Sequence, residues 1–229
     1  MRSAVCAGAY CLKFFLWETG YWKTMDIAHD RAGYYLCWGC LVWVPGLYTS
    51  PALYLVRHPT ELTPWVACGV LLLGLAAIYV NWEADDQRQR VRETDGHCLV
   101  WGRKPDVIVA GYQSGAPPRD RALCEWRALC GRLSAARRAG GELKSSLLLA
   151  SGWWGLARHM HYVPEILAAV CWTAPAGARH GLPWFYVAFL TVLLLDRLYR
   201  DQTRCKAKYG EHWDEYCRRV PYMVIPYVL

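Results

Sequence analysis

The strongest constraint in this sequence is a run of 24 residues, 33–56, that contains no Asp, Glu, Lys or Arg. A helix needs about 20 apolar residues to cross the hydrocarbon core of a bilayer, so this run is long enough to span one. The region 83–146, by contrast, contains twelve Lys or Arg residues. Because a soluble protein spreads its charge over every surface element, this segregation indicates a protein with several membrane-spanning segments.

Three further stretches are apolar enough to enter a membrane: 65–82, 147–176 and 182–195. The run 33–56 is interrupted by Pro45 and Pro51, and 147–176 is interrupted by four polar residues. These are Arg158, His159, His161 and Glu165. The fold class predicted from these segments is all-α, a multispanning membrane helical bundle.

The composition supports the same interpretation. The chain has 229 residues, of which 55% are hydrophobic, and it contains 13 Trp and 15 Tyr but only 4 Phe. Aromatic rings with a polar tip suit the membrane interface. The net charge of +7 does not accompany any nucleic-acid-binding motif, so no nucleic-acid partner is expected. The 11 cysteines lie mostly in apolar runs, and Cys37 and Cys40 are expected to pack rather than to bind a metal.

Basic residues give an orientation and a division of the chain. The region 83–146 and the tail, with seven Lys or Arg from Arg197 to Arg219, are both expected in the cytosol. The predicted segments are a cytosolic or interfacial 1–32, membrane helices in 33–82, a cytosolic loop 83–146, and a C-terminal membrane region and tail, 147–229. Within the loop, a strand is expected at 106–110, after Pro105, and 115–141 is an atypical insertion.

Polar side chains inside a membrane segment are candidates for function because they are costly there. Arg158 and Tyr162 are four residues apart and would share one face of a helix, where the Arg fork suits a phosphate. His159 and His161 are two apart and would diverge by about 200° on a helix, so no metal site is predicted from them.

The tail carries a second set of charges. Arg200, Arg204 and Lys208 repeat every four residues and would form one positive stripe on a helix. The stripe is explained either by a phosphorylated ligand or by basic side chains reaching the membrane surface. Arg88 and Arg92 form another pair at the same spacing. The sequence has neither a Rossmann glycine motif nor a P-loop, so a dinucleotide site here would be of another type.

Three passages together carry a family resemblance: SGWWGLARHMHY, LPWFYVAFLTVLLLDRLYRDQTRCKAKYG and HWDEYCRRVPYMVIPYVL. They closely resemble the C-terminal signatures of the sterol C14/Δ7 reductase family. The resemblance runs from about residue 22 to the end, except for 115–141. TDGHCLVWGRKPDVI and KTMDIAHDRAGYYLCWG are more similar to the Δ7 branch.

The resemblance implies a ten-helix protein of the endoplasmic-reticulum membrane that binds NADPH beside a sterol pocket. The implied reaction is reduction of the sterol Δ7 (C7–C8) double bond, as from 7-dehydrocholesterol to cholesterol. The implied partners are the sterol, the lipid bilayer and other enzymes of sterol biosynthesis. Because only the C-terminal half of the family is matched, about four to six of the ten helices are expected, and the chain is expected to be part of a longer protein.

The family pattern also assigns residues by matching positions. The proton donor is not assigned in this way: Tyr48, after the Pro45 break, is the candidate, with Asp201 acting beside it, and the alternative is that Tyr48 anchors the segment at the membrane interface. The implied NADPH contacts are Arg88, Arg92, Leu149, Trp154, His161, Tyr162, Asp201, Cys205, Lys206, Ala207, Lys208, Tyr209 and Tyr216.

Four positions depart from the family pattern. His161 stands in place of Asn, Pro164 in place of Gly, Cys40 in place of Asp and Asp196 in place of His. The alternatives are therefore a Δ14-sterol reductase, an inactive sterol- or NADPH-binding fragment and, more distantly, a membrane methyltransferase that uses S-adenosylmethionine.

Overall fold

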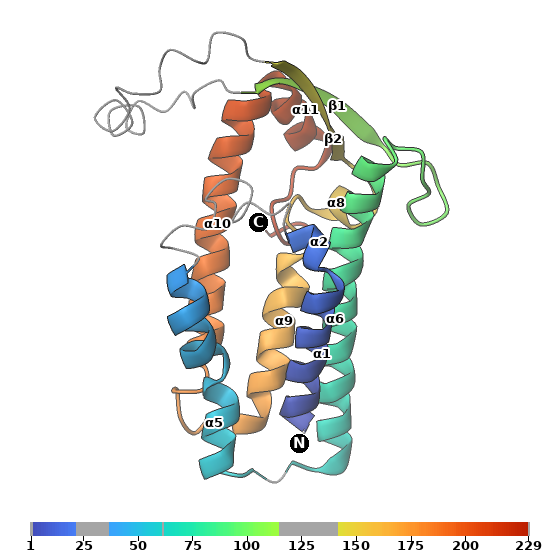
Figure 1. Cartoon of the computed structure of the whole chain (residues 1–229). Helices are drawn as coiled ribbons and strands as arrows, with labels where there is room; N and C mark the ends of the chain where they lie inside the picture. Colours follow the sequence, from blue (N-terminus) through green and yellow to red (C-terminus); the bar gives the residue numbers. More distant parts are fainter. Residues whose placement is uncertain (1, 22–36, 61, 115–141, 229) are drawn as a thin grey trace, which may run out of the picture. The chain divides into compact units, whose positions relative to one another are not determined.

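The structure is a computed structural model that describes residues 2–21, 37–60, 62–114 and 142–228 (Figure 1). Its elements in chain order are α1 (Arg2–Leu16), α2 (Glu18–Tyr21), η1 (Gly39–Tyr48), α5 (Ser50–Arg57), α6 (Pro64–Glu93), β1 (Val107–Ser114), β2 (Glu142–Leu149), α8 (Trp153–Leu156), α9 (Tyr162–Thr173), η3 (Ala174–Ala176), α10 (Phe185–Tyr209) and α11 (Glu211–Arg219). These elements divide between two compact units. Unit 1 comprises described residues of 1–89 and 159–195, and unit 2 those of 90–158 and 196–229.

Unit 1 is a bundle of helices. In Figure 1, α1, α6 and α9 run alongside one another. Their contact includes three alanines, Ala77 of α6, Ala168 of α9 and Ala9 of α1, together with the larger side chains of Ile78, Tyr10 and Leu167. Small side chains let helix backbones approach closely, which is how helices associate where lipid removes the hydrophobic driving force.

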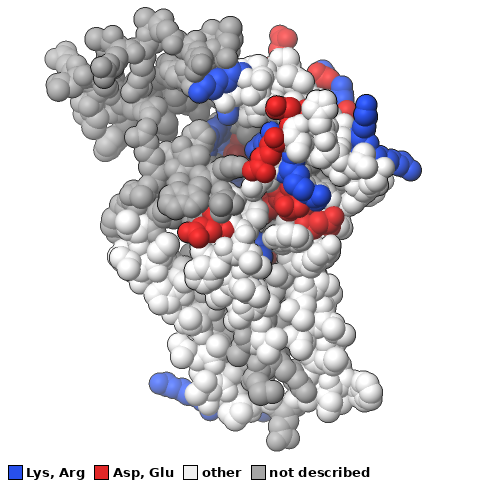
Figure 2. All heavy atoms as spheres, turned by 45° about the vertical axis from the view of Figure 1, so that its right-hand side comes forward, with Lys and Arg blue, Asp and Glu red and all other residues white. Residues whose placement is uncertain are grey.

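Two helical stretches of the described residues are long and apolar enough to cross a bilayer, Gly39–Arg57 and Pro64–Glu93. Their side chains face outward to an unusual degree, with Leu41 76%, Val56 80% and Trp65 85% exposed. Figure 2 shows a wide surface with almost no Lys, Arg, Asp or Glu. Such a surface is unfavourable in water and suits lipid, in agreement with the membrane segments predicted for 33–56 and 65–82.

The first of these stretches is irregular around Pro45. Residues 39–48 form π-helical turns, and α5 continues from Ser50. Proline lacks an amide hydrogen and cannot continue the regular helical ladder. The side chains of the next turn use the carbonyls there, since Thr49 Oγ1 donates to Pro45 O at 2.5 Å and Ser50 Oγ donates to Leu47 O at 2.7 Å.

The prediction of one membrane segment over 147–176 is wrong. Leu147–Leu149 ends β2, α8 is a single turn, and α9 begins only at Tyr162. An apolar run does not by itself distinguish a buried strand from a helix. The segment also turns at Gly152, whose φ of 63° is readily adopted only by glycine.

The all-α prediction is also incomplete, because unit 2 contains an antiparallel hairpin. β1 pairs with β2 in a register that sets Val107 opposite Leu149 and Ser114 opposite Glu142. The strand expected at 106–110 is thus confirmed, but its partner strand was not predicted. The insertion predicted at 115–141 lies outside the described residues.

The hairpin packs on α11 to form the core of unit 2 (Figure 1). The buried residues of this core are Ile108, Ala110, Leu148, Tyr209, Trp213, Tyr216 and Val220. α10 ends at Tyr209, and the φ of 56° at the next residue, Gly210, permits the chain to turn directly into α11. α11 then carries acidic residues in its first turn and basic residues in its last, which complements the helix dipole.

Replacing Ile108 with Ala tests this core. Ile108 is 5% exposed, whereas its neighbour Val109 is 60% exposed on the opposite face of β1. We expect Ile108→Ala to lower the free energy of unfolding by about 2–5 kcal/mol through loss of buried methyl groups and the cavity left behind. Val109→Ala, the matched control, is expected to cost less than about 1 kcal/mol. Denaturant unfolding in detergent, followed by tryptophan fluorescence, measures both; equal costs would contradict the described register.

Candidate functional site

The basic face predicted for the tail lies on α10 within unit 2. Most of its cations already have a partner. Arg200 is 3.9 Å from Asp196, and Lys206 of the same helix is 3.3 Å from Asp214. Arg204 is half-buried and makes no hydrogen bond or ion pair within the part of the chain that the structure describes. A half-buried guanidinium that lacks a protein acceptor favours an external anion.

Lys208, at the end of the stripe, contacts aromatic rings. Its Nζ lies 3.9 Å from the ring centroid of Tyr112 and 4.8 Å from that of Tyr209. A cation over a ring face is held by the ring quadrupole. Tyr112 was not predicted for the site. Its signal in the sequence is the alternation of β1, which puts Tyr112 on the same face as Ile108 and Ala110.

Aromatic rings continue from Tyr209 into α11. Tyr209 stacks on Trp213 with centroids 6.5 Å apart, and Trp213 contacts Tyr216 at 5.2 Å. The Tyr216 hydroxyl donates to the Trp154 carbonyl at 3.4 Å. All four side chains are buried. These four aromatic side chains are therefore packed core residues of unit 2, which support the hairpin and the basic face.

Leu149, Trp154 and Arg92 come together at the other side of the hairpin. Leu149 and Trp154 pack with Val91 and Val100 in one buried cluster. Arg92 is exposed and its Nε donates to the Leu147 carbonyl at 3.4 Å. Leu149, Trp154 and Arg92, three of the predicted cofactor contacts, are therefore neighbours within unit 2, and the Arg92 guanidinium is the most exposed of the three side chains.

Asp201 and Cys205 form a side-chain pair one turn apart on α10. The Cys205 thiol donates to Asp201 Oδ2 at 3.7 Å. Burial, followed by the negative charge of Asp201, raises the pKa of Cys205 to about 12. Desolvation lowers the pKa of the neighbouring Arg204 guanidinium. Both shifts reflect a part of α10 that is sheltered from water although it is rich in charge.

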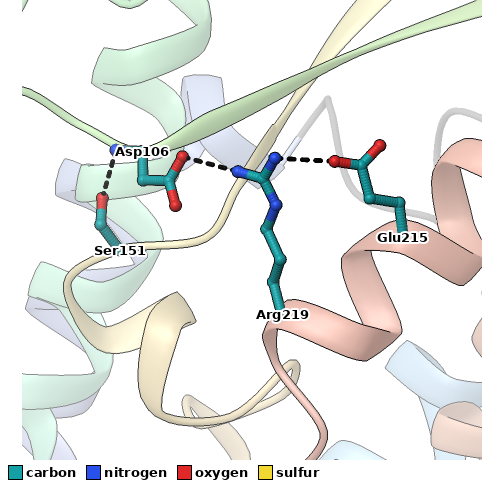
Figure 3. A network of polar contacts seen from close by, with 4 residues as sticks. All are labelled: Asp106, Ser151, Glu215 and Arg219. Atoms are coloured by element: carbon teal, nitrogen blue, oxygen red, sulfur yellow. Dashed lines mark hydrogen bonds and ion pairs between the residues drawn. The ribbon is translucent and has the colours of Figure 1, made fainter.

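A polar network fixes the start of the hairpin (Figure 3). Arg219, the last residue of α11, donates to Asp106 Oδ1 at 2.9 Å and to Glu215 Oε1 at 2.7 Å. The Asp106 amide donates to Ser151 Oγ at 3.1 Å. Hydrogen bonding to Glu215, and the charge of Asp106, raise the pKa of Arg219. The network ties α11 to the ends of both strands and so positions the core beneath the basic face.

In unit 1, Tyr48 belongs to an aromatic cluster. It is half-buried at the end of η1, and its ring lies 4.7 Å from that of Tyr186. Tyr186 stacks on Trp172 with centroids 5.3 Å apart and an interplanar angle of 11°. Tyr162 and Leu190 pack around these rings. The Tyr48 ring thus packs in an aromatic cluster, and its role as proton donor stays a prediction.

The remaining predicted residues of unit 1 are Arg88, His161 and Tyr162. Arg88 Nη2 lies 3.3 Å from Oδ1 of the buried Asp85. The His161 carbonyl accepts a hydrogen bond from Asn81 Nδ2 at 2.9 Å, and the His161 ring lies 4.4 Å from that of Tyr162.

The helix-based argument for Arg158 and its neighbours is wrong, because α9 begins at Tyr162. Arg158 does not share a helix face with Tyr162; it is buried in unit 2, where its Nη2 donates to the Pro221 carbonyl at 3.3 Å. His159 and His161 lie in the turns before the helix, with ring centroids 5.9 Å apart. The phosphate role predicted for Arg158 assumed a helix face shared with Tyr162, and the 200° angle between the two imidazoles assumed that both lie on a helix. Neither assumption holds.

The predicted site residues thus fall into two sets. Unit 1 contains Tyr48, Arg88, His161 and Tyr162; unit 2 contains Arg92, Leu149, Trp154, Asp201, Cys205, Lys206, Ala207, Lys208, Tyr209 and Tyr216. Because Tyr48 and Asp201 belong to different units, their joint catalytic role stays a prediction.

Comparison with known proteins agrees with the resemblance identified from the sequence. Residues 4–229 match the profile of the ergosterol biosynthesis ERG4/ERG24 family. The chain belongs to this family. It is 54% identical over 217 residues to a 7-dehydrocholesterol reductase of Arabidopsis thaliana, covering 95% of this chain and 45% of the relative.

Other members of the ERG4/ERG24 family are also similar. A 7-dehydrocholesterol reductase of Danio rerio is 38% identical over 222 residues, 97% of this chain and 41% of the relative. A Δ14-sterol reductase of Methylotuvimicrobium alcaliphilum is 35% identical over 217 residues, 95% of this chain and 43% of the relative. The chain spans less than half the length of these relatives.

The reactivity of Cys205 tests the sheltered environment on α10. A thiolate is the nucleophile, so a thiol with a pKa of about 12 should react with iodoacetamide at pH 8 roughly a thousandfold more slowly than an ordinary thiol. Its rate should still rise about tenfold per pH unit at pH 10, where an ordinary thiol has levelled off. Peptide-resolved mass spectrometry measures the rate.

Asp201→Asn is the matched variant, because it removes the charge that favours the protonated thiol. The variant should react faster than the parent, and its rate should level off at a lower pH. Restricted access alone would slow alkylation equally at every pH, so a profile that levels off below pH 9 in the parent would contradict the raised pKa.

Proposed function

We propose that this chain contributes the cofactor-binding half of an NADPH-dependent reductase that saturates the sterol Δ7 (C7–C8) double bond, in the manner of 7-dehydrocholesterol to cholesterol. The observation that carries the proposal is the difference in identity among relatives. The chain is 54% identical to a plant 7-dehydrocholesterol reductase but 35% identical to a Δ14-sterol reductase. The proposed location is the endoplasmic-reticulum membrane, in contact with other enzymes of sterol biosynthesis.

The cations of unit 2 fit a dinucleotide with several phosphates. Arg204 has a guanidinium without a protein acceptor among the described residues, and Lys208 and Arg200 lie one turn to either side on α10. Arg binds phosphate through two parallel hydrogen bonds. Besides Arg204, the residues proposed to hold NADPH are those implied by the family pattern: Arg88, Arg92, Leu149, Trp154, His161, Tyr162, Asp201, Cys205, Lys206, Ala207, Lys208, Tyr209 and Tyr216.

The reduction is proposed to be ionic. Tyr48, assisted by Asp201, donates a proton to the alkene and leaves a carbocation on the sterol. When bound, NADPH supplies the hydride that completes the new C–H bond. The rings of Tyr186 and Trp172 contact Tyr48 directly or through one another, and aromatic faces stabilise a nearby cation. The apolar surroundings also exclude water, which would otherwise trap the cation.

The direct test is the conversion of 7-dehydrocholesterol. Membranes that contain the 229-residue chain, or a chimera in which it replaces the matching segment of the Arabidopsis relative, are incubated with the sterol and NADPH. We expect loss of the conjugated diene absorbance and formation of cholesterol, identified by mass spectrometry. If neither form produces cholesterol, the proposal is rejected.

Tyr48→Phe tests the proton donor in the same assay. The variant keeps the ring that packs on Tyr186 but loses the hydroxyl. Loss of a general acid lowers kcat by about 100- to 10,000-fold. Tyr54→Phe is the matched control, because Tyr54 is a phenol of unit 1 whose ring contacts His58 and His180 instead.

A Δ14-sterol reductase is the second candidate, because relatives of that activity match at 35% and 36% identity, close to the 38% of the Danio rerio 7-dehydrocholesterol reductase. Incubation with a Δ8,14-sterol decides between them. Faster reduction of that sterol than of 7-dehydrocholesterol would reassign the specificity while preserving the reductase proposal.

Arg204→Gln tests the use of NADPH. The 2′-phosphate distinguishes NADPH from NADH, and a lost charged hydrogen bond to it costs about 1.5–3 kcal/mol, or roughly 10- to 100-fold in affinity. We expect that loss for NADPH and little change for NADH, measured by fluorescence titration of the detergent-solubilised chain. Arg218→Gln, at an exposed position of α11, serves as the control. If the variant weakened the binding of NADPH and of NADH equally, Arg204 would not be the residue that binds the 2′-phosphate.

A further inference from the structure

The loop between α6 and β1 turns large apolar side chains outward (Figure 1). Leu99 is 62% exposed and Trp101 is 54% exposed, whereas Val100 between them is buried in the core of unit 2. Neither exposed residue belongs to the predicted cofactor contacts or to the proposed proton donors. The proposed reaction therefore gives no account of an exposed tryptophan and leucine at this position.

Trp101 has a backbone conformation that a bulky residue rarely adopts. Its φ is 50°, and that of Gly102 is 75°. The Val100 amide donates to the Arg103 carbonyl at 2.9 Å and the Arg103 amide donates to the Val100 carbonyl at 3.1 Å, which closes a two-residue turn. Turns with positive φ at both central residues strongly favour Asn or Gly at the first of them. A tryptophan there is strained, and such strain is typical of a functional site.

A second tryptophan supports the exposed ring. The rings of Trp101 and Trp153 meet edge to face, with centroids 5.2 Å apart and an interplanar angle of 81°. Trp153 is half-buried and packs against the buried cluster that contains Val91, Val100 and Leu149. Although its ring lies against Trp153, more than half of the Trp101 surface stays exposed. The loop is therefore a supported projection, and the position of the outward ring is fixed before any partner binds.

Two cations follow the turn directly. Arg103 and Lys104 are exposed, and neither makes an ion pair among the residues that the structure describes. Asp106, the next acidic residue along the chain, already pairs with Arg219 at 2.9 Å. A tryptophan beside basic residues is typical of a membrane interface, where the ring enters the headgroup region and the cations attract anionic lipids.

The loop starts close enough to a candidate membrane helix to reach such an interface. Residues 64–82 of α6 carry no charged side chain, whereas residues 83–93 are rich in charge. At 1.5 Å per residue the charged part extends about 16 Å, past a headgroup layer of roughly 5–8 Å. Residues 94–99 span up to about 20 Å when extended. The chain is therefore long enough to return from the end of α6 to the lipid headgroups.

We propose that Leu99 and Trp101 insert into the headgroup region of an anionic membrane surface, while Arg103 and Lys104 bind the lipid phosphates and carboxylates. The loop thereby attaches unit 2 to the bilayer. The inference is independent of the proposed reaction, because none of these four side chains takes part in it. The alternative is a packing role, in which the Trp101 ring only covers Trp153.

Photo-crosslinking of the 229-residue chain in lipid nanodiscs tests the proposal. A benzoylphenylalanine replaces Leu99, and mass spectrometry identifies what is attached to it after irradiation. We expect phospholipid adducts that are about threefold or more as abundant when the nanodisc contains phosphatidylserine as when it contains phosphatidylcholine alone. The same probe in place of His212, an exposed residue of α11, is the control and should acquire little lipid.

Two further variants separate the contributions of charge and ring. The double variant Arg103→Gln, Lys104→Gln should remove the dependence on phosphatidylserine, because no cation then follows the turn. Trp101→Asn introduces a residue that this turn favours, so the loop keeps its fold. It should nevertheless lower the lipid adducts at position 99 by about threefold or more, because the ring that enters the interface is gone.

Three outcomes would overturn the proposal. The probe at position 99 could yield no more lipid adducts than the probe at position 212, or it could attach to protein instead of lipid. Adducts that are equally abundant with and without phosphatidylserine would show that the two cations recognise no anionic surface. An unchanged yield in Trp101→Asn would assign the ring to packing on Trp153.

Discussion

The arrangement of unit 1 depends on one constraint, which is that polar groups between packed apolar helices are shielded from water. Each must find a protein partner, however distant in the sequence. Tyr10 with Glu165, and Lys13 with Asn81, meet this requirement across α1, α6 and α9. The apolar contacts between these helices are made by both small and large side chains, and the polar pairs add directional contacts to them.

Unit 2 is held together mainly by an apolar core, which lies between the hairpin and the short helix α11. The inward face of β1 and the apolar face of α11 bury Ile108, Tyr209 and Trp213. The charges then gather outside this core, where Arg219 joins Asp106 and Glu215 and where Lys208 lies over Tyr112. Arg204 is the exception, since the structure gives it burial without a counterion among the described residues. A bound phosphate would supply the negative charge that the half-buried Arg204 guanidinium lacks.

The sequence predicted the parts of the fold that depend on local pattern. The length of the apolar run at 65–82 predicted the first part of α6, whose remainder to Glu93 was assigned to a loop, and the four-residue spacing of Arg200, Arg204 and Lys208 identified a helical face. Local pattern failed at 147–176, since the leucines that end β2 and the first turns after them are as apolar as a helix. The strand at 106–110 was foreseen, but its partner follows a long insertion and has no local signal. Tyr10 and Glu165 were missed as a pair for the same reason, because only tertiary packing joins them.

The departures from the family pattern can be weighed with these contacts. Asn81 bonds to the backbone carbonyl of residue 161, so His in place of Asn preserves that link between α6 and α9. Pro164 is the third residue of α9, where the amide has no intrahelical acceptor and proline is tolerated. Asp196, where the family has His, gains an ion pair with Arg200. The imidazole of His161 is therefore the substitution with the most bearing on the proposed NADPH site, since it offers one ring donor where a carboxamide offers a paired donor and acceptor.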